Sequence, residues 1–465
     1  MKPKDVLLER WTDILARKGD SPAIFNARGE VVRSFRQIDD RARDFEAKID
    51  NFERGRVLAV QIGNHEDWPA ILIACLRGGV VVLPLEQSIS DQRRESAFKI
   101  CNVVAAAVPG GRSIEVLPIR TSAATTNWAS DPPALLKLTS GTTAAPRAIR
   151  FRSEQLLADC DQICGTKGIS DVDLNFGVIP VSHSYGFSNL LTPLIARAVP
   201  MALSQDRTPL AVLEDLARTK ATVFPGTPVF FQAFCEITDI PKLPKLRLCI
   251  SAGAPLPFAT AKKFREKLGL SIHSFYGASE CGGICYDREA KLEIEGYVGT
   301  PMAGVDLEMI DRKAESSQVR VRSGAAGDAY FPEPDEEKLG NGVFVPDDLL
   351  TREGEGFRIV GRVSDLINVA GKKVNPAEIE EVLLKCPGVR QAVAFGRVGS
   401  ASLRNEEIVA CVVADVDLSE SQALEFCRAQ LSAWQVPKRI FVVESIPTNE
   451  RGKTSRRELA TRFSA

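Results

Sequence analysis

Hydrophobic and polar positions alternate with two different periods along the chain up to about residue 295. Apolar runs typical of buried strands occupy 56–63, 80–84, 102–109 and 221–226. Between them, 153–163 and 209–220 carry apolar side chains at i, i+3 and i+4, which is the helical period. Strands and helices that alternate in this way predict an α/β fold with largely parallel sheets.

The pattern changes after about residue 295, where strands become shorter and turn residues more frequent, as in FPEPDEEKLGNG at 331–342. Short strands with frequent turn residues predict a β-rich lobe with surface loops. Over the last hundred or so residues, the segments 377–389, 406–416, 419–431 and 438–446 alternate helix and strand. That length suffices for a separate small α/β domain, so we expect a domain boundary in the 350s to 360s.

Composition and charge place the chain among ordinary globular proteins. It has 465 residues, 44% hydrophobic and 26% charged, with a formal net charge of -1, which indicates neither a nucleic-acid nor a membrane-surface partner. The first fifteen residues are charged and lack an apolar core, so we expect no targeting segment and a cytoplasmic location. The apolar stretches 80–85 and 190–203 are too short or, at Arg197, interrupted, so a soluble protein is expected.

Eleven cysteines are scattered along the chain without framework spacing. An odd count in a large chain without a signal peptide predicts reduced thiols. The pairs Cys160/Cys164 and Cys281/Cys285 have CxxxC spacing rather than the CxxC of zinc ribbons, and only three histidines accompany them. We therefore expect the cysteines to be small buried hydrophobes.

The segment LTSGTTAAPR at 138–147 admits two interpretations on its own. The first is a Ser/Thr turn whose hydroxyls cap the neighbouring backbone. The second is a phosphate-binding loop, in which the glycine lets the backbone approach phosphate oxygens closely and the hydroxyls donate to them. It is not a Walker A loop, because no GKS or GKT follows.

Four later segments, in order, decide between these readings: ISAGAPLP at 250–257, FYGASE at 275–280, GRVSDLINVAGKKVNPAEIEEVL at 361–383 and IPTNERGKTSRREL at 446–459. With LTSGTT they resemble the core motifs of the adenylate-forming superfamily, which includes acyl-CoA synthetases, aryl-acid ligases, luciferases and the adenylation domains of nonribosomal peptide synthetases. The resemblance implies a large, multi-lobed N-terminal adenylation domain over 1–361 and a small, mobile α/β domain over 362–465.

The family's reaction is implied as well. A carboxylate attacks the α-phosphorus of ATP, pyrophosphate leaves, and a thiol captures the acyl-adenylate. The implied cofactors are ATP and Mg²⁺, with either coenzyme A or the phosphopantetheine of a free-standing acyl or peptidyl carrier protein as acceptor. The alternative is a non-catalytic relative that binds nucleotide or a carrier protein. A dinucleotide-dependent enzyme is not expected, because no GxGxxG follows an early strand.

Carried over residue by residue, the resemblance assigns a nucleotide site. The phosphate loop consists of Thr139, Ser140, Gly141, Thr142, Thr143 and Arg147, with Thr142 also in the catalytic set. Ala252, Gly253, Ala254, Tyr276 and Gly277 surround adenine, and Asp348 with Arg362 holds the ribose. Ser279 offers a hydroxyl to the α-phosphate, Glu280 binds magnesium, and Lys453 bridges the acid and ATP.

The acyl and thiol sites are assigned in the same way. The residues expected at the acyl pocket are His183, Phe187, Phe230, Phe275 and Gly277. The bulk of the phenylalanines favours an aryl or compact acyl group. The phenylalanines are equally consistent with plain core. Asp365, Gly371 and either Lys372 or Lys373 match the segment that faces the thiol channel. The sequence identifies neither the acid nor the oligomeric state.

Several positions depart from the family pattern. Ala144 and Arg147 stand where glycine and lysine are usual, so we expect a stiffer loop whose cation can grip phosphate bidentately. Ser364 stands at the hinge, where Asp or Lys is usual, and serine does not forbid rotation. Pro346, Asp347 and Asp348 stand where Thr-Gly-Asp is usual, so Asp347 is an alternative to Asp348 as the ribose ligand.

Overall fold

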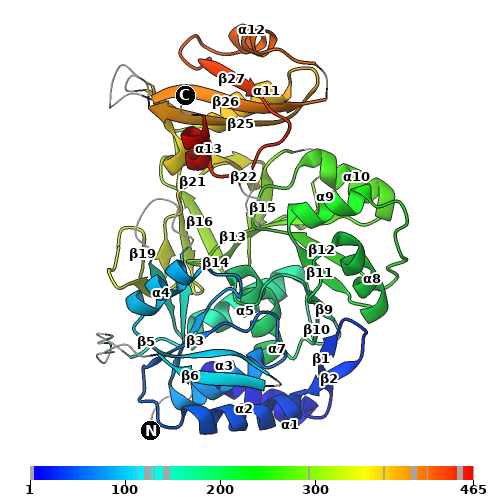
Figure 1. Cartoon of the computed structure of the whole chain (residues 1–465), viewed down its shortest axis with the longest axis vertical. Coiled ribbons are helices and arrows are strands. Elements are labelled where there is room, and N and C mark those ends of the chain that lie inside the picture. The colour runs from blue at the N-terminus through cyan, green and yellow to red at the C-terminus, as the bar shows by residue number, and fades with distance from the viewer. Residues whose placement is uncertain are drawn as a thin grey trace. The chain divides into compact units, whose positions relative to one another are not determined.

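The computed structural model describes residues 5–111, 113–119, 126, 128, 131–139, 147–291, 294–369, 372–398, 406–415, 417–447 and 454–463. The chain forms two compact units (Figure 1). The first comprises Met1–Glu308 and Arg320–Val345, and the second comprises Met309–Val319 and Pro346–Ala465. The boundary expected at 361/362 stays a prediction.

The largest sheet of the first unit carries the strands that lead to the predicted site. From one edge its order is β2 (Val31–Ser34), β1 (Pro22–Asn26), β10 (Met201–Leu203), β9 (Asn175–Gly177), β11 (Val223–Gly226), β12 (Leu248–Ser251), β13 (Ile272–Ala278), β14 (Gly282–Tyr286) and β15 (Tyr297–Pro301). The pairs from β1 to β13 are parallel, whereas β13, β14 and β15 are antiparallel. The carboxyl ends of β11, β12 and β13 therefore lie at one edge of the sheet.

A second sheet in this unit has the order β18 (Ala329–Phe331), β8 (Ala148–Phe151), β7 (Leu135–Leu138), β4 (Val81–Pro84), β3 (Val57–Val60), β5 (Val103–Gly110) and β6 (Ser113–Pro118). Its centre is parallel and packs around fully buried side chains such as Val57, Leu83 and Leu136. A smaller sheet has the order β16 (Val305–Met309), β17 (Val319–Ser323), β20 (Val343–Phe344) and β19 (Leu339–Gly340).

Helices of the first unit cover these sheets, with α8, α9 and α10 beside β11 and β12 in Figure 1. They are α1 (Val6–Lys18), α2 (Phe35–Ile49), α3 (Trp68–Gly78), α4 (Asp91–Ile100), α5 (Ser153–Lys167), α6 (Ser184–Gly186), the π-helix η1 (Phe187–Leu191), α7 (Thr192–Arg197), α8 (Pro209–Thr219), α9 (Pro228–Glu236) and α10 (Phe258–Leu268). Within the described ranges, no helix combines the length and apolar character that crossing a bilayer requires.

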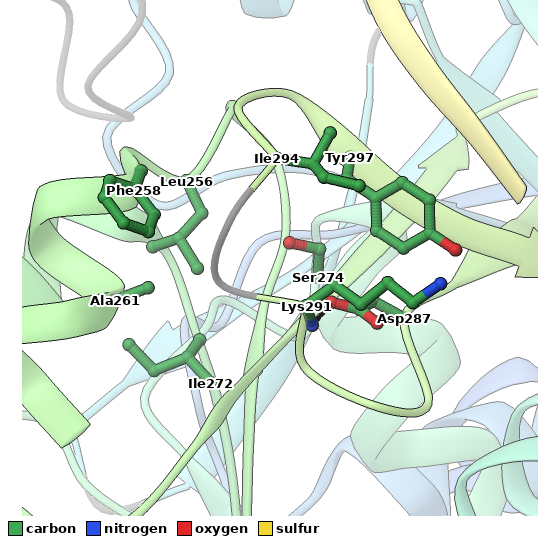
Figure 2. Close-up of a pocket in the computed structure, with 9 residues that line it drawn as sticks. All are labelled: Leu256, Phe258, Ala261, Ile272, Ser274, Asp287, Lys291, Ile294 and Tyr297. Carbon is green, nitrogen blue, oxygen red and sulfur yellow. Dashed lines mark hydrogen bonds between the residues drawn. The ribbon is translucent and has the colours of Figure 1, made fainter. Parts of the chain in front are cut away.

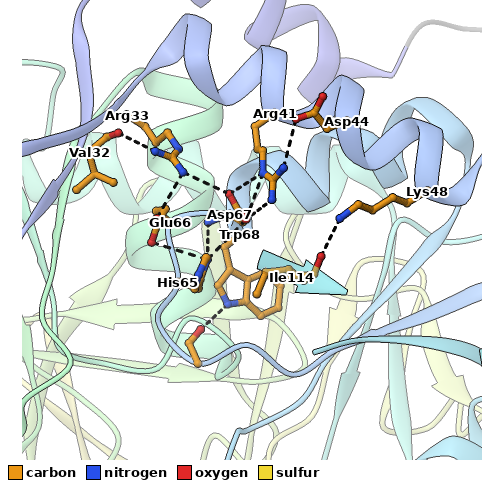
Figure 3. Close-up of polar contacts among 11 residues, drawn as sticks. Val32, Arg33, Arg41, Asp44, Lys48, His65, Glu66, Asp67, Trp68 and Ile114 are labelled. Carbon is orange, nitrogen blue, oxygen red and sulfur yellow. Dashed lines mark hydrogen bonds and ion pairs between the residues drawn. The ribbon is translucent and has the colours of Figure 1, made fainter. Parts of the chain in front are cut away.

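The start of α3 is tied to α2 by a buried carboxylate, Asp67 (Figure 3). Asp67 is 2% exposed, and the Arg41 guanidinium of α2 donates to it at 3.1–3.3 Å. Arg33 lies 4.0 Å from the same carboxylate. A buried charge is stable only when it is paired, so this cluster fixes how the two helices pack.

The second unit is a small α/β body. Its elements are β21 (Asp348–Glu353), β22 (Gly356–Arg362), the 3-10 helix η2 (Val363–Asp365), β23 (Ile367–Val369), β24 (Lys372–Val374), α11 (Pro376–Leu384), β25 (Val389–Val398), β26 (Glu406–Ala414), α12 (Glu420–Gln430), β27 (Arg439–Val442) and α13 (Arg456–Arg462). β25 and β26 are antiparallel, β26 and β27 are parallel, and one core joins α11 and α12 to this sheet.

The predicted fold class is confirmed: the parallel-rich sheets, the β-rich segment after residue 295 and the small C-terminal α/β unit are all present. All eleven cysteines are free and buried, as the sequence predicts. Burial raises the pKa of most of these thiols, as at Cys411, where it reaches about 11.

Candidate active site

The two ends of the predicted phosphate loop are held together by Thr139 and Arg147. β7 and β8 are antiparallel neighbours, and the loop joins them. The Thr139 amide donates to the Arg147 carbonyl at 2.8 Å, and the Thr139 hydroxyl donates to the same oxygen at 3.1 Å. Ser140, Gly141, Thr142, Thr143 and Ala144 lie outside the described residues. The strand pair thus defines where the loop begins and ends.

The Arg147 side chain lies between a ring and a carboxylate. Its guanidinium carbon is 4.3 Å from the centre of the Tyr330 ring, and Nη1 is 3.5 Å from Asp335 Oδ2. The Tyr330 hydroxyl in turn donates to Glu280 Oε1 at 3.2 Å. Burial, and then the charge of Glu280, raises the pKa of Tyr330. The phenol therefore stays protonated and acts as a donor.

Ser279 and Glu280 directly follow β13. The Glu280 carbonyl accepts from the Gly327 amide at 2.8 Å, and the Ser184 hydroxyl donates to the Ser279 hydroxyl at 3.1 Å. Within β13, a side chain at Gly277 would place its Cβ 2.6 Å from the Gly282 carbonyl oxygen. Glycine at 277 is therefore required by the tight β13–β14 hairpin, which fixes the path of the chain into the Ser279–Glu280 pair.

The residues predicted around adenine lie at the carboxyl ends of β12 and within β13. Ala252 follows β12, and its amide donates to the Gly226 carbonyl at the end of β11 at 3.2 Å. Gly253 is exposed with φ +88°, a conformation that favours glycine. Ala254 is half-buried, and Tyr276 is 8% exposed. Ligands of α/β sheets bind at this end of parallel strands.

The predicted acyl residues differ in exposure. His183 is half-buried and caps α6, with Nδ1 accepting from the Tyr185 amide at 3.2 Å. Phe187 is 1% exposed, with Lys137 Nζ 5.7 Å from its ring centre. Phe230 is half-buried and meets Phe224 edge to face at 6.1 Å. Phe275 is 8% exposed.

Lys167, at the end of α5, meets Phe275 in the interior. It is 5% exposed, its Nζ lies 3.3 Å from the Phe275 ring centre, and it donates to Asn189 Oδ1 at 2.8 Å. No carboxylate of the described residues forms an ion pair with this amine. Burial lowers the pKa of Lys167 to about 7.

A separate pocket of the first unit lies between α10 and the β14–β15 connection (Figure 2). Apolar side chains from Leu256, Phe258, Ala261 and Ile272 line one side of it, and Asp287, Lys291 and Tyr297 line the other. The predicted site residues do not line this pocket, which therefore adds nothing to the assignment of the active site.

In the second unit, Asp348 and Arg362 form an ion pair across β21 and β22. The two residues are directly opposite in the register, and Arg362 Nε lies 2.7 Å from Asp348 Oδ1. Asp348 is 7% exposed, whereas Asp347 is exposed. A carboxylate oriented by an arginine suits recognition of a diol, so this geometry favours Asp348 over Asp347 as the ribose ligand.

The segments around the predicted thiol channel and Lys453 are partly described. Lys372 is exposed, with its Nζ 4.8 Å from the Trp434 ring centre. Gly371 and Lys453 lie outside the described residues. Just after Lys453, Arg456 is anchored by Asp365 at 2.6 Å and by Glu380 at 2.8 Å. The start of α13 is thus fixed to the segment next to Ser364, the predicted hinge residue.

Comparison with known protein families identifies the family to which the chain belongs. The family model described as AMP-binding enzyme matches residues 11–328, and its C-terminal domain model matches 378–453. The chain belongs to the AMP-binding enzyme family. This AMP-binding enzyme is 24% identical to a long-chain-fatty-acid–CoA ligase of Escherichia coli O157:H7, over 97% of the chain and 94% of the relative. It is 27% identical to a 3,4-dihydroxybenzoate–[aryl-carrier protein] ligase of Bacillus anthracis, over 72% and 75% respectively.

Solved structures agree with the fold of this AMP-binding enzyme. ATP-bound MatB from Rhodopseudomonas palustris superposes with a TM-score of 0.85 at 22% identity, over 99% of each chain. The superfamily resemblance predicted from the five motifs is therefore confirmed. The roles of the individual residues stay predictions.

The motif series misses residues that lie outside the motifs. Tyr330, Asp335 and Lys167 each contact a predicted site residue of this AMP-binding enzyme. Tyr330 directly precedes the acidic loop at 331–342. The one sequence feature that could have drawn attention to it is the rarity of tyrosine, since the chain has five. Lys167 carries no signal, because a lysine in the last turn of a helix usually faces solvent.

Proposed function

We propose that this AMP-binding enzyme activates a carboxylic acid with ATP, releases pyrophosphate and transfers the acyl group to a thiol of coenzyme A or of carrier-protein phosphopantetheine. The observation that carries the proposal is the cluster formed by Arg147, Tyr330 and Glu280 beside Ser279. It brings a cation and a carboxylate from two separate motifs, and a hydroxyl from outside the motifs, to one place in the first unit. The non-catalytic alternative is not favoured, because the relatives reported above are ligases.

A carboxylate is a weak nucleophile toward an anionic phosphate, so alignment and charge neutralisation must supply the rate. Arg147 would draw charge from the departing pyrophosphate, and Ser279 would donate to the α-phosphate. Glu280 fits a Mg²⁺ site, since Mg²⁺ in nucleotide enzymes takes one or two carboxylates together with water and phosphate oxygens. When bound, that cation would neutralise charge on the phosphates. Lys453 would complete the cationic surroundings of the reacting carboxylate.

The two segments of the chain would have different roles in this reaction. Residues 1–361 would bind ATP and the acid, and residues 362–465 would carry Lys453 together with the thiol-channel residues Gly371 and Lys372. Phe224 and Phe234 are 1% exposed and belong to the core, whereas Phe230, which packs on both with ring centres 6.1 and 6.2 Å away, is half-buried. Phe230 is therefore the member of this aromatic cluster that would restrict the pocket to an aryl or compact acid.

Pyrophosphate exchange over a panel of aryl, short and long carboxylic acids tests the first half-reaction. We expect acid-dependent incorporation of labelled pyrophosphate into ATP, with compact acids preferred. Mass spectrometry with coenzyme A then identifies the acceptor, because accumulation of acyl-CoA would exclude strict dependence on a carrier protein. Pure, folded protein without acid-dependent exchange for any member of the panel would contradict the proposal.

Asp348→Asn is expected to raise the KM for ATP about 10-fold, because hydrogen bonds to a charged acceptor are worth roughly 1.5–3 kcal/mol. Asp347→Asn is the matched control, since its side chain is exposed and lies one residue away. Steady-state exchange kinetics measure both variants, and melting temperatures verify folding. Equal effects of the two substitutions would reject the choice of Asp348.

A further inference from the structure

The position of Tyr330 is dictated by strand register. β18 pairs with β8 so that Tyr330 lies opposite Ile149. Side chains two residues apart on a strand share a face, so Arg147 and Ile149 point the same way, and the Tyr330 ring meets Arg147 diagonally. The observed 4.3 Å between the guanidinium carbon and the ring centre agrees with this register. Tyr330 is itself 6% exposed and is thus held in place by its surroundings.

Glu280 reaches Tyr330 from a different sheet. The backbone bond from the Gly327 amide to the Glu280 carbonyl, 2.8 Å long, lies three residues before Tyr330. Gly327 must be glycine, since a Cβ there would be 2.6 Å from Ile149 Cγ2. The chain entering β18 therefore passes close to both β8 and the end of β13, and it delivers the Tyr330 hydroxyl to the Glu280 carboxylate at 3.2 Å.

We infer that Tyr330 is a positioning residue that couples the Mg²⁺-binding carboxylate of Glu280 to the phosphate-loop cation Arg147, and that arginine at 147 is the partner this tyrosine requires. The inference rests on the proposed function.

A tyrosine suits this task for an electrostatic reason. Its neutral hydroxyl orients the Glu280 carboxylate without cancelling the negative charge that a divalent cation needs, whereas a lysine or arginine in its place would compete with the metal.

The ring of Tyr330 also explains the unusual arginine. A guanidinium is flat and stacks on an aromatic face, while the compact ammonium of lysine does not hold one orientation there. Asp335 restrains one end of the guanidinium at 3.5 Å. Arg147 is therefore oriented before nucleotide binds, which lowers the ordering cost at the moment of binding.

Three variants separate the two contacts. Tyr330→Phe removes the hydroxyl and keeps the ring, Tyr330→Leu removes both, and Arg147→Lys removes the stacking partner. Tyr297→Phe is the matched control, because Tyr297 is also 6% exposed, lies under a lysine at 5.3 Å and belongs to the separate pocket. Calorimetric ATP binding is measured across a series of MgCl₂ concentrations, pyrophosphate exchange is measured in parallel, and melting temperatures report folding.

We expect Tyr330→Phe to raise the Mg²⁺ concentration for half-maximal ATP binding about 10-fold, as loss of a hydrogen bond to a charged group predicts. ATP binding without Mg²⁺ and the Tyr297→Phe control should not change. Arg147→Lys should lower exchange in the wild-type background but have little further effect beside Tyr330→Leu, since the two residues act as one unit.

Two results would overturn the inference while leaving the function intact. One is an unchanged Mg²⁺ requirement for ATP binding in folded Tyr330→Phe. The other is that the effects of Arg147→Lys and Tyr330→Leu on the exchange rate are additive. Both results count only if the wild-type enzyme exchanges pyrophosphate. A wild-type protein that shows neither Mg²⁺-dependent ATP binding nor exchange rejects the proposed function and this inference together.

Discussion

Replacement of Lys453 by alanine is expected to lower acid-dependent pyrophosphate exchange about 10²-fold or more while the chain stays folded. The superfamily resemblance gives this lysine the bridge between the carboxylate and ATP, and loss of one such charge-stabilising group in a transition state costs roughly that factor. Because the contact strengthens as charge moves, the turnover rate should fall more than the affinity for ATP.

Two neighbouring cations serve as controls for Lys453. Arg457 is exposed on α13, so Arg457→Ala removes a positive charge four residues away without expected loss of exchange. Arg456 is bonded to Asp365 and Glu380, so Arg456→Ala should instead lower the melting temperature of the second unit. An exchange rate for Lys453→Ala equal to that of Arg457→Ala would remove the lysine from the mechanism.

Lys167→Met is expected to raise the free energy of unfolding by a few kcal/mol at neutral pH. The folded chain holds the pKa of this amine at about 7, while the unfolded chain has it near its usual value of roughly 10.4. Between these values the unfolded state binds a proton that the folded state does not, so burial of the lysine costs stability. The cost is absent above about pH 10.4, grows as the pH falls, and is constant below about 7.

Chemical denaturation at several pH values between 6 and 10.5 measures this effect. The stability gained by Lys167→Met over the wild type should shrink as the pH rises. Lys262→Met is the control, because Lys262 is exposed on α10 and should show no such trend. A destabilised Lys167→Met, or a gain that does not depend on pH, would mean that the Asn189 and Phe275 contacts outweigh the cost of burial.

Local sequence signals predict much of this fold. The runs at 80–84 and 221–226 become β4 and β11, and the helical period at 209–220 becomes α8. Each of these signals is carried by consecutive residues, since apolar periodicity reports directly on which face is buried. The strand β25 is a miss, because the turn residues Pro387 and Gly388 stand directly before it and the polar Arg390 and Gln391 interrupt its alternation.

The site is predicted as far as its motifs extend. Glu280 and Arg147 are found because they stand beside recognisable segments, whereas Tyr330 depends on the pairing of β18 with β8, about 180 residues apart in sequence. No local pattern encodes that register. The burial of Lys167 is not predictable from local sequence for a related reason. Tertiary packing of η1 and β13 covers the end of α5, whereas the sequence pattern alone would leave that helix end in solvent.

The burial of all eleven cysteines gives this chain a practical property. Thiol reagents react with accessible thiolates, and enclosed cysteines do not offer that access. A single cysteine introduced on the exposed face of α12 or α10 would therefore be labelled selectively in an otherwise native sequence. One such cysteine on each element would accept a pair of fluorophores, with no need to remove native cysteines first. A change in the distance between them during turnover would test the mobility of the C-terminal segment that the superfamily resemblance implies.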